Sequence, residues 1–286
     1  MRFVNFYARW LLHHTRLPGL LQLARRGSTR RLLAAGRVDK HLRFPAAEGV
    51  ELDVWLLRAR GRAGGDSAPR GVVLIVHGLW DSKGRFLPLG ELLARRGFDV
   101  ILPDLRRHGR STGPHTTFGA LEKRDLAALV DHLLAAGEVR GPVWVFGFSM
   151  GAAIAVQYAA IELRVRGVVA AAPFQDGWSI ARRFVPLMSL ATYRAVWARA
   201  AEIAHFDPAE CSTLTAAAGL HCPLVVAHGQ CDPIVPYRHG RAVFQAAGEP
   251  KRFHTVWWSG HSSLLLMGRH WFADRIEEAV AMAEGR

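Results

Sequence analysis

Short apolar runs alternate with longer stretches of mixed apolar and polar residues along most of the chain. The run at residues 72–76 (VVLIV) is apolar throughout, which is typical of a strand buried on both faces. Runs of this kind predict strands at 38–44, 50–58, 72–76, 98–102, 143–147, 167–171, 223–228 and 252–257. Stretches with helical periodicity predict helices at 84–96, 118–136, 150–162, 237–247 and 262–283. Trp257 and Trp258 are interpreted as sheet residues.

This alternation of strand and helix predicts an α/β fold, with a mostly parallel eight-stranded sheet flanked by helices. The interval of about fifty residues between the sixth and seventh predicted strands is too long for one crossover helix. Its aromatic residues favour a small helical cap, inserted at about 174–220 within a main domain that spans 37–286.

Residues 1–36 form a separate basic segment, with seven arginines, no lysine and no acidic residue. Phe3, Phe6, Tyr7, Trp10 and Leu11 recur at helical spacing, and a second helix is expected at about 20–35. Two interpretations stay open for this N-terminal helical extension. Either the aromatic face of the extension packs on its own domain, or the extension makes a peripheral contact with a membrane surface.

Composition excludes several classes of protein. The chain has 286 residues, of which half are hydrophobic, so a large core is easily filled. The net charge of +13 falls to +6 without residues 1–36 (30 basic against 24 acidic), and no nucleic-acid recognition motif accompanies it. We expect a cytoplasmic protein, peripheral to the membrane if the first segment binds lipid. The three cysteines form no metal-ligand pattern, and no apolar run approaches transmembrane length.

Polar residues follow several predicted strands at their carboxyl ends, where functional residues of such sheets gather. The stretch 147–151 (GFSMG) sets Ser149 between a strand and a helix, in the G-x-S-x-G pattern of a nucleophile elbow. Asp232 and His261 each follow a later strand, 83 and 29 residues further on in turn. The order Ser, Asp, His predicts nucleophile, acid and base, with Asp176 as a rival acid after residues 167–171.

From about Leu42 to its end, the chain resembles the α/β-hydrolase superfamily. Residues 77–79 (HGL) and 104–113 (DLRRHGRSTG) are similar to the branch of monoacylglycerol lipases and serine aminopeptidases. That branch usually has glycine where this chain has Arg107. The resemblance implies an oxyanion hole formed by the backbone N–H groups of Leu79 and Met150. It implies no cofactor.

Further residues have expected roles around these positions. We expect the substrate to contact His77, Gly78, Trp80, Phe148 and Trp178. His77 and His108 are interpreted as hydrogen-bonding residues that organise loops, Asp104 as a residue that ties loops together, and His228 as a core histidine. No two candidate ligands share a helix at H-x-x-x-H spacing, so no metal site is predicted.

Together these features predict a serine hydrolase that cleaves small apolar carboxylic esters, including acylglycerols, as an esterase or lipase. Its acyl-enzyme would form on Ser149. Serine aminopeptidase, thioesterase and acyltransferase activities remain alternatives on the same three residues. A membrane-surface binding protein that retains the hydrolase scaffold is the alternative from a different class. The sequence does not fix the oligomeric state.

Overall fold

One eight-stranded sheet runs through the protein in the order β1-β2-β4-β3-β5-β6-β7-β8. The computed structural model describes residues 1–13, 36–60 and 68–286. Strand β2 pairs antiparallel with both neighbours, and all other pairs are parallel. The strands are β1 (Lys40–Pro45), β2 (Glu51–Leu57), β3 (Val72–Val76), β4 (Asp99–Pro103), β5 (Val143–Phe148), β6 (Val165–Ala171), β7 (Leu224–Gly229) and β8 (Lys251–Val256). The predicted fold class is confirmed.

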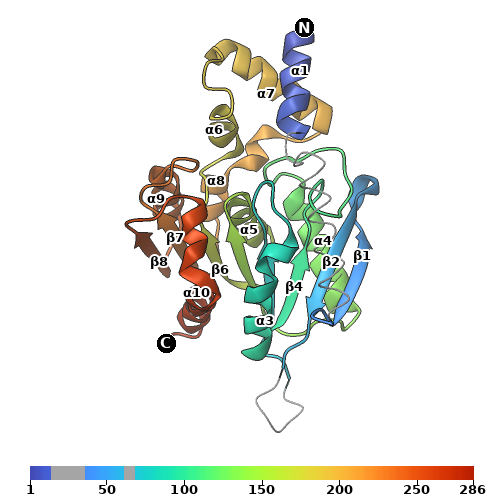
Figure 1. The fold of residues 1–286 in the computed structure, drawn as a ribbon, viewed down its shortest axis with the longest axis vertical. Coiled ribbons are helices and arrows are strands. Elements are labelled where there is room, and N and C mark those ends of the chain that lie inside the picture. The colour runs from blue at the N-terminus through green and yellow to red at the C-terminus, as the bar shows by residue number, and fades with distance from the viewer. Residues whose placement is uncertain (14–35, 61–67) are drawn as a thin grey trace.

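Helices cover both faces of this sheet (Figure 1). The helices of the described residues are α1 (Arg2–His13), α3 (Leu87–Arg95), α4 (Glu122–Ala135), α5 (Met150–Ile161), α6 (Gly177–Arg182), α7 (Leu190–Ala204), α8 (Thr213–Ala218), α9 (Tyr237–Ala246) and α10 (Gly268–Ala283). Side chains alternate between the two faces of a strand, so each buried strand supplies two cores. In β3, Val72, Leu74 and Val76 face the layer of α4 and α5, whereas Val73 and Ile75 face the layer of α3 and α10.

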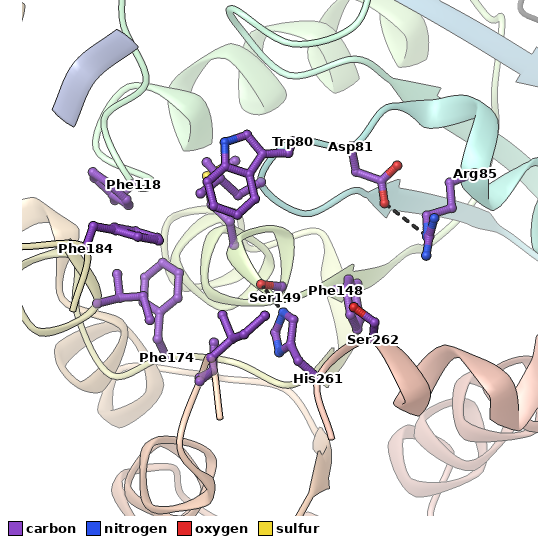
Figure 2. Close-up of a pocket in the computed structure, with 15 residues that line it drawn as sticks. Trp80, Asp81, Arg85, Phe118, Phe148, Ser149, Phe174, Phe184, His261 and Ser262 are labelled. Atoms are coloured by element: carbon purple, nitrogen blue, oxygen red, sulfur yellow. Dashed lines mark hydrogen bonds and ion pairs between the residues drawn. The ribbon is translucent and has the colours of Figure 1, made fainter. Parts of the chain in front are cut away.

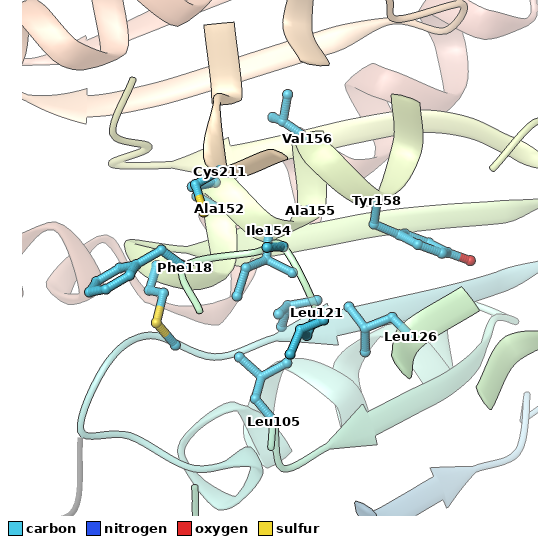
Figure 3. Close-up of a cluster of buried hydrophobic side chains, with 14 of the residues drawn as sticks. Leu105, Phe118, Leu121, Leu126, Ala152, Ile154, Ala155, Val156, Tyr158 and Cys211 are labelled. Carbon is cyan, nitrogen blue, oxygen red and sulfur yellow. The ribbon is translucent and has the colours of Figure 1, made fainter. Parts of the chain in front are cut away.

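Helix α5 lies at the centre of the larger core. Every residue from Met150 to Ala159 is buried, as expected of a helix that is apolar on all sides. Figure 3 shows Ile154 and Tyr158 of this helix beside Leu121 and Leu126. The helix that follows Ser149 is therefore fixed by packing along its first ten residues.

Helices α6, α7 and α8 stand between β6 and β7, where the sequence predicted a cap. Helix α1 lies along α7 (Figure 1), and Arg199 Nε donates a hydrogen bond of 2.7 Å to Asn5 Oδ1. Ala8, Leu11 and Leu12 are buried, so this helix packs on its own domain. The second helix predicted at 20–35 lies outside the described residues, and the division at residue 36 stays a prediction.

Four predicted elements differ from the observed ones in their bounds. A 3-10 turn at Ser262–Met267 precedes α10, and the chain breaks at Gly268, whose φ of 80° is incompatible with a continuous helix. A second 3-10 turn, Lys83–Phe86, similarly precedes α3, and α4 begins at Glu122. The interpretation of Trp257 and Trp258 as sheet residues is wrong, because β8 ends at Val256 and both indoles are exposed in a turn.

The turn before α3 carries a buried charge that the hydrophobic pattern does not predict. Lys83 Nζ lies 2.5 Å from Asp53 Oδ1 and also contacts Asp104 Oδ2, and all three side chains are buried. Burial pushes the pKa of Asp53 upward, but the nearby Lys83 ammonium and His41 outweigh it and leave this pKa below its usual value. The lysine therefore joins β2, the turn and the loop after β4 through charge.

We predict that Lys83→Ala destabilises the protein by about 3–5 kcal/mol, because it leaves Asp104 buried without its cation and removes the buried ammonium from Asp53. Urea denaturation measures the change. Lys40→Ala, which removes an ion pair on the surface, is the control and is expected to change stability little. Equal effects of the two substitutions would contradict a structural role for the buried lysine.

Candidate active site

The turn from β5 into α5 holds Ser149 in a strained conformation, with φ 55° and ψ −118°. Two flanking glycines make that turn possible. A Cβ atom at Gly147 would lie 2.2 Å from Gly151 O, and one at Gly151 would lie 2.2 Å from Val76 O. Neither position has room for a side chain, so the helix starts directly against the ends of β5 and β3, with the serine between them.

A chain of two hydrogen bonds ends on this serine. His261 Nε2 lies 2.9 Å from Ser149 Oγ, and His261 Nδ1 lies 2.6 Å from Asp232 Oδ2. The backbone N–H groups of Ile234 and Val235 donate to Asp232 Oδ1 at 2.9 and 2.8 Å, which fixes the carboxylate. With Nδ1–H donating to Asp232, His261 Nε2 is left as the acceptor for the serine hydroxyl.

Asp176, the rival acid, has another structural role. Its side chain accepts a hydrogen bond of 2.6 Å from Ser179 N–H and caps the start of α6. Its isolated bridge to Ser212 ties that helix to the segment before α8. In the part of the chain that the structure describes, Asp232 is the carboxylate hydrogen-bonded to His261.

Two backbone N–H groups are available beside the serine. Gly78 lies close to it, since a Cβ atom there would stand 3.3 Å from Ser149 Cβ. Leu79 follows that glycine, and Met150 is the first residue of α5, where a helix has no internal partner for its N–H groups. Within residues 1–13, 36–60 and 68–286, neither N–H has a hydrogen-bond acceptor. Ser149 N–H, by contrast, donates to Ala171 O.

The loop residues around the site have the expected structural contacts. His77 Nε2 accepts a hydrogen bond from Leu105 N–H and its Nδ1 contacts Gly78 O, which joins the loops after β3 and β4. Asp104 accepts from the backbone of Lys83 and Arg110.

Two further histidines are also buried. His108 Nδ1 contacts Arg106 O, and His228 Nε2 contacts Val235 O at 2.9 Å. None of the three side chains, His77 included, reaches Ser149 through a hydrogen bond.

A cavity of about 210 Å³ opens above Ser149. Figure 2 shows Phe118, Phe174 and Phe184 on one side of the serine, with the ion pair of Asp81 and Arg85 on the other. Ten of the fifteen lining residues are apolar: Leu79, Trp80, Phe118, Phe148, Met150, Phe174, Ile180, Phe184, Ile234 and Val235. The remaining five are Asp81, Arg85, Ser149, His261 and Ser262.

Only two of the five residues expected to contact substrate line this cavity, namely Trp80 and Phe148. His77 is fully buried beneath the loop, and Gly78 packs against the backbone of Phe148. Trp178 instead packs against Tyr193 and Trp197 inside the cap. These three residues therefore shape the site without lining it.

Several lining residues were not identified from the sequence. Asp81, Phe174 and Val235 lie in the loops that follow β3, β6 and β7, so the position of a residue after a strand could have identified them. Phe118 and Phe184 come from long connections whose path depends on tertiary packing, and no local pattern marks them.

The chain was compared with known proteins. A family model described as "Serine aminopeptidase, S33" matches residues 67–203. An uncharacterized protein of Bacillus subtilis, YqkD, is 37% identical over 87 residues, which are 30% of this chain and 28% of that protein. A monoacylglycerol lipase of Mycolicibacterium smegmatis is 32% identical over 121 residues, 41% of this chain and 40% of the lipase.

Solved structures match more of the chain. The esterase Pf2001 of Pyrococcus furiosus superimposes with a TM-score of 0.65 at 22% identity, over 84% of this chain and 91% of that one. Among relatives found by sequence, an uncharacterized protein of Mycobacterium tuberculosis is 28% identical over 224 residues, which are 78% of this chain and 72% of that protein. These likenesses show that the chain has the α/β-hydrolase fold.

Two features are absent from residues 1–13, 36–60 and 68–286. No helix there is both long and apolar enough to cross a membrane. No group of three or more histidine, cysteine, aspartate or glutamate side chains there is arranged to hold a metal ion. All three cysteines of the chain fall within these ranges and are free thiols.

Buried neutral histidines predict how stability depends on pH. Burial lowers the pKa of His77 to about 3 and that of His239 to about 4, and it also lowers the pKa values of His108 and His228. Below the unfolded value of about 6.5, the unfolded chain binds protons that the folded chain does not. The free energy of unfolding should therefore fall between pH 7 and pH 5, by up to about 1.4 kcal/mol per pH unit for each histidine.

Urea denaturation at the two pH values tests this. His239→Gln should give a shallower dependence than the wild type, because it removes one of the groups that take up a proton on unfolding. A free energy of unfolding that stays constant or rises on acidification would contradict the prediction.

Proposed function

We propose that this protein is a serine hydrolase that cleaves carboxylic ester bonds through an acyl-enzyme on Ser149. One observation carries the proposal, namely the hydrogen-bonded chain from Asp232 through His261 to Ser149 Oγ at a mainly apolar cavity. Serine is a weak nucleophile without a base, and this arrangement supplies one.

The proposed reaction follows from these contacts. As Ser149 Oγ attacks the ester carbonyl, its proton passes to His261 Nε2, and Asp232 stabilises the resulting imidazolium. The N–H groups of Leu79 and Met150 donate to the oxyanion that forms. The tetrahedral intermediate expels the alcohol, which takes the proton from His261. A water molecule then attacks the acyl carbonyl and gives a proton to the same nitrogen. The second tetrahedral intermediate expels Ser149 Oγ, which takes that proton back from His261, and the acid is released.

The lining of the cavity favours an apolar acyl ester over a peptide. An aminopeptidase has to bind a substrate ammonium group, and Asp81 is the one carboxylate among the described lining residues. Asp81 already lies 3.1 Å from Arg85 Nε, so its charge is compensated. The names of the similar lipase and esterase also support the ester assignment, whereas the description of the family model favours aminopeptidase activity as the second candidate.

A binding protein on the same scaffold is less well supported. Such a protein has no need for a strained serine, and a strained non-glycine residue costs about 1–3 kcal/mol. It also has no need for a carboxylate that orients the histidine bonded to that serine.

Hydrolysis of p-nitrophenyl esters from acetate to palmitate, beside an aminoacyl anilide, tests the proposal. We expect ester cleavage by the wild type, and a loss of about 10⁴-fold or more in kcat for Ser149→Ala and Asp232→Asn. Asp176→Asn is the matched control and should retain activity, since this carboxylate caps α6. Preference for the anilide would overturn the ester assignment, and an active Ser149→Ala variant would overturn the proposed nucleophile.

Trp80 and Phe184 are expected to limit the acyl chain. Their rings meet edge to face with centroids 5.9 Å apart, one from the loop after β3 and the other from the cap, and both line the cavity. Trp80→Ala should lengthen the space for the acyl group and raise kcat/KM for palmitate relative to butyrate by about tenfold, since each buried methylene contributes about 0.8 kcal/mol.

Trp257→Ala, which removes an exposed indole outside this cavity, is the control. If the ratio of kcat/KM for palmitate to kcat/KM for butyrate is the same in Trp80→Ala as in the wild type, this ring does not limit the acyl site.

A further inference from the structure

The end of the protein that carries the cap exposes large apolar side chains. Phe3 and Phe6 of α1 are 55% and 63% exposed, although the opposite side of that helix is buried. Leu187 and Leu190, at the start of α7, are 100% and 52% exposed. Contact with an apolar partner would remove the apolar area of these four side chains from water, which is energetically favourable.

The same region carries mainly positive charge, and the one acidic residue of α7, Glu202, is already paired with Arg199. Neither residues 1–13 nor residues 177–201 contain aspartate or glutamate. Arg2, Arg9 and Arg194 are exposed and have no carboxylate partner in the described part of the chain. Residues 1–13 and 177–201 therefore form a positively charged surface that also exposes apolar side chains.

Contacts between the segments hold this surface together. Asn5 Oδ1 accepts the hydrogen bond from Arg199 of α7, and Thr116 N–H donates to Leu12 O at 3.2 Å. Arg107 Nη2 donates to His13 O, which anchors the end of α1 to the loop after β4. Figure 1 shows the beginnings of α1 and α7 at the same end of the molecule.

We propose that this cap-end surface, formed by Phe3, Phe6, Leu187, Leu190 and the exposed arginines of α1 and α7, docks on an anionic lipid bilayer. The apolar side chains would enter the boundary between headgroups and acyl chains, and the guanidinium groups would pair with lipid phosphates. The sequence left membrane contact of residues 1–36 as one of two interpretations, and the proposal adds the cap as the second half of the surface.

Charge decides between a bilayer and the other occupants. A second copy of this chain would bring arginines against arginines, and the one carboxylate of α7, that of Glu202, is already paired with Arg199. A nucleic acid would engage the arginines but would leave the exposed phenylalanines and leucines without a role. An anionic bilayer satisfies both groups at once.

Docking would also place the cavity near the lipid. Ile180 of α6 and Phe184, which precedes α7, belong to the cap and line the cavity above Ser149. The proposed membrane contact does not depend on the hydrolase assignment, because a chain without activity would present the same surface.

Co-sedimentation of the full chain with vesicles tests the proposal. The vesicles contain phosphatidylcholine alone or phosphatidylcholine with phosphatidylglycerol. We expect the wild type to bind the anionic vesicles and to dissociate as NaCl is raised from about 0.1 M to about 1 M. Phe3→Ser with Phe6→Ser, and separately Arg2→Gln with Arg9→Gln, should each weaken partitioning by about tenfold or more.

Two matched controls remove the same residue types at the opposite end of the sheet. Leu163→Ser alters an exposed leucine before β6, and Arg140→Gln alters an exposed arginine before β5. Neither should change vesicle binding, and all variants should hydrolyse a water-soluble ester at the wild-type rate in the absence of vesicles.

Three outcomes would overturn the proposal. One is a wild-type chain that does not bind anionic vesicles. Another is a loss of binding that the control variants share. The third is a concentration-dependent dimer in size-exclusion chromatography that the substitution of Phe3 and Phe6 abolishes while vesicle binding persists, which would assign the surface to a second copy.

Discussion

The close approach of α5 to the ends of β3 and β5 constrains the rest of the site. This approach requires glycine at positions 147 and 151, where a side chain would collide with backbone 2.2 Å away, and it requires a turn at Ser149 with a positive φ. Such strain costs about 1–3 kcal/mol, and it persists only where surrounding packing outweighs it. The fully buried first three turns of α5 supply that packing. The serine hydroxyl is consequently held clear of both strand and helix, within reach of His261.

Sheet register brings the other two residues to that hydroxyl. Strands β7 and β8 pair in parallel and end together, with Gly229 opposite Val256. Asp232 and His261 follow these ends by only a few residues, so the short connections cannot carry them far apart. The cap is built differently. Its helices pack among themselves and against α1, so the part of the molecule that shapes the cavity above the serine is held by side-chain contacts rather than by the sheet.

Much of this arrangement could be predicted from the sequence because it depends on local periodicity and on chain order. All eight strands were predicted, as were the residues Ser149, Asp232 and His261, whose catalytic roles stay predictions. Features that depend on distant contacts could not be predicted. Nothing in the sequence near Lys83 indicates that it is buried, because its partners Asp53 and Asp104 are distant in the chain. Trp178 was expected to contact substrate, but its side chain lies inside the cap, where it packs against Tyr193 and Trp197.

The central claim is that Ser149 is a nucleophile activated by His261, and covalent labelling tests it most directly. Intact-mass spectrometry after treatment with a fluorophosphonate should show the addition of one phosphonyl group to the wild type. Peptide mapping should place that group on Ser149, and Ser149→Ala should remain unlabelled. An unlabelled wild type, or an equal adduct on the Ser149→Ala variant, would contradict the account.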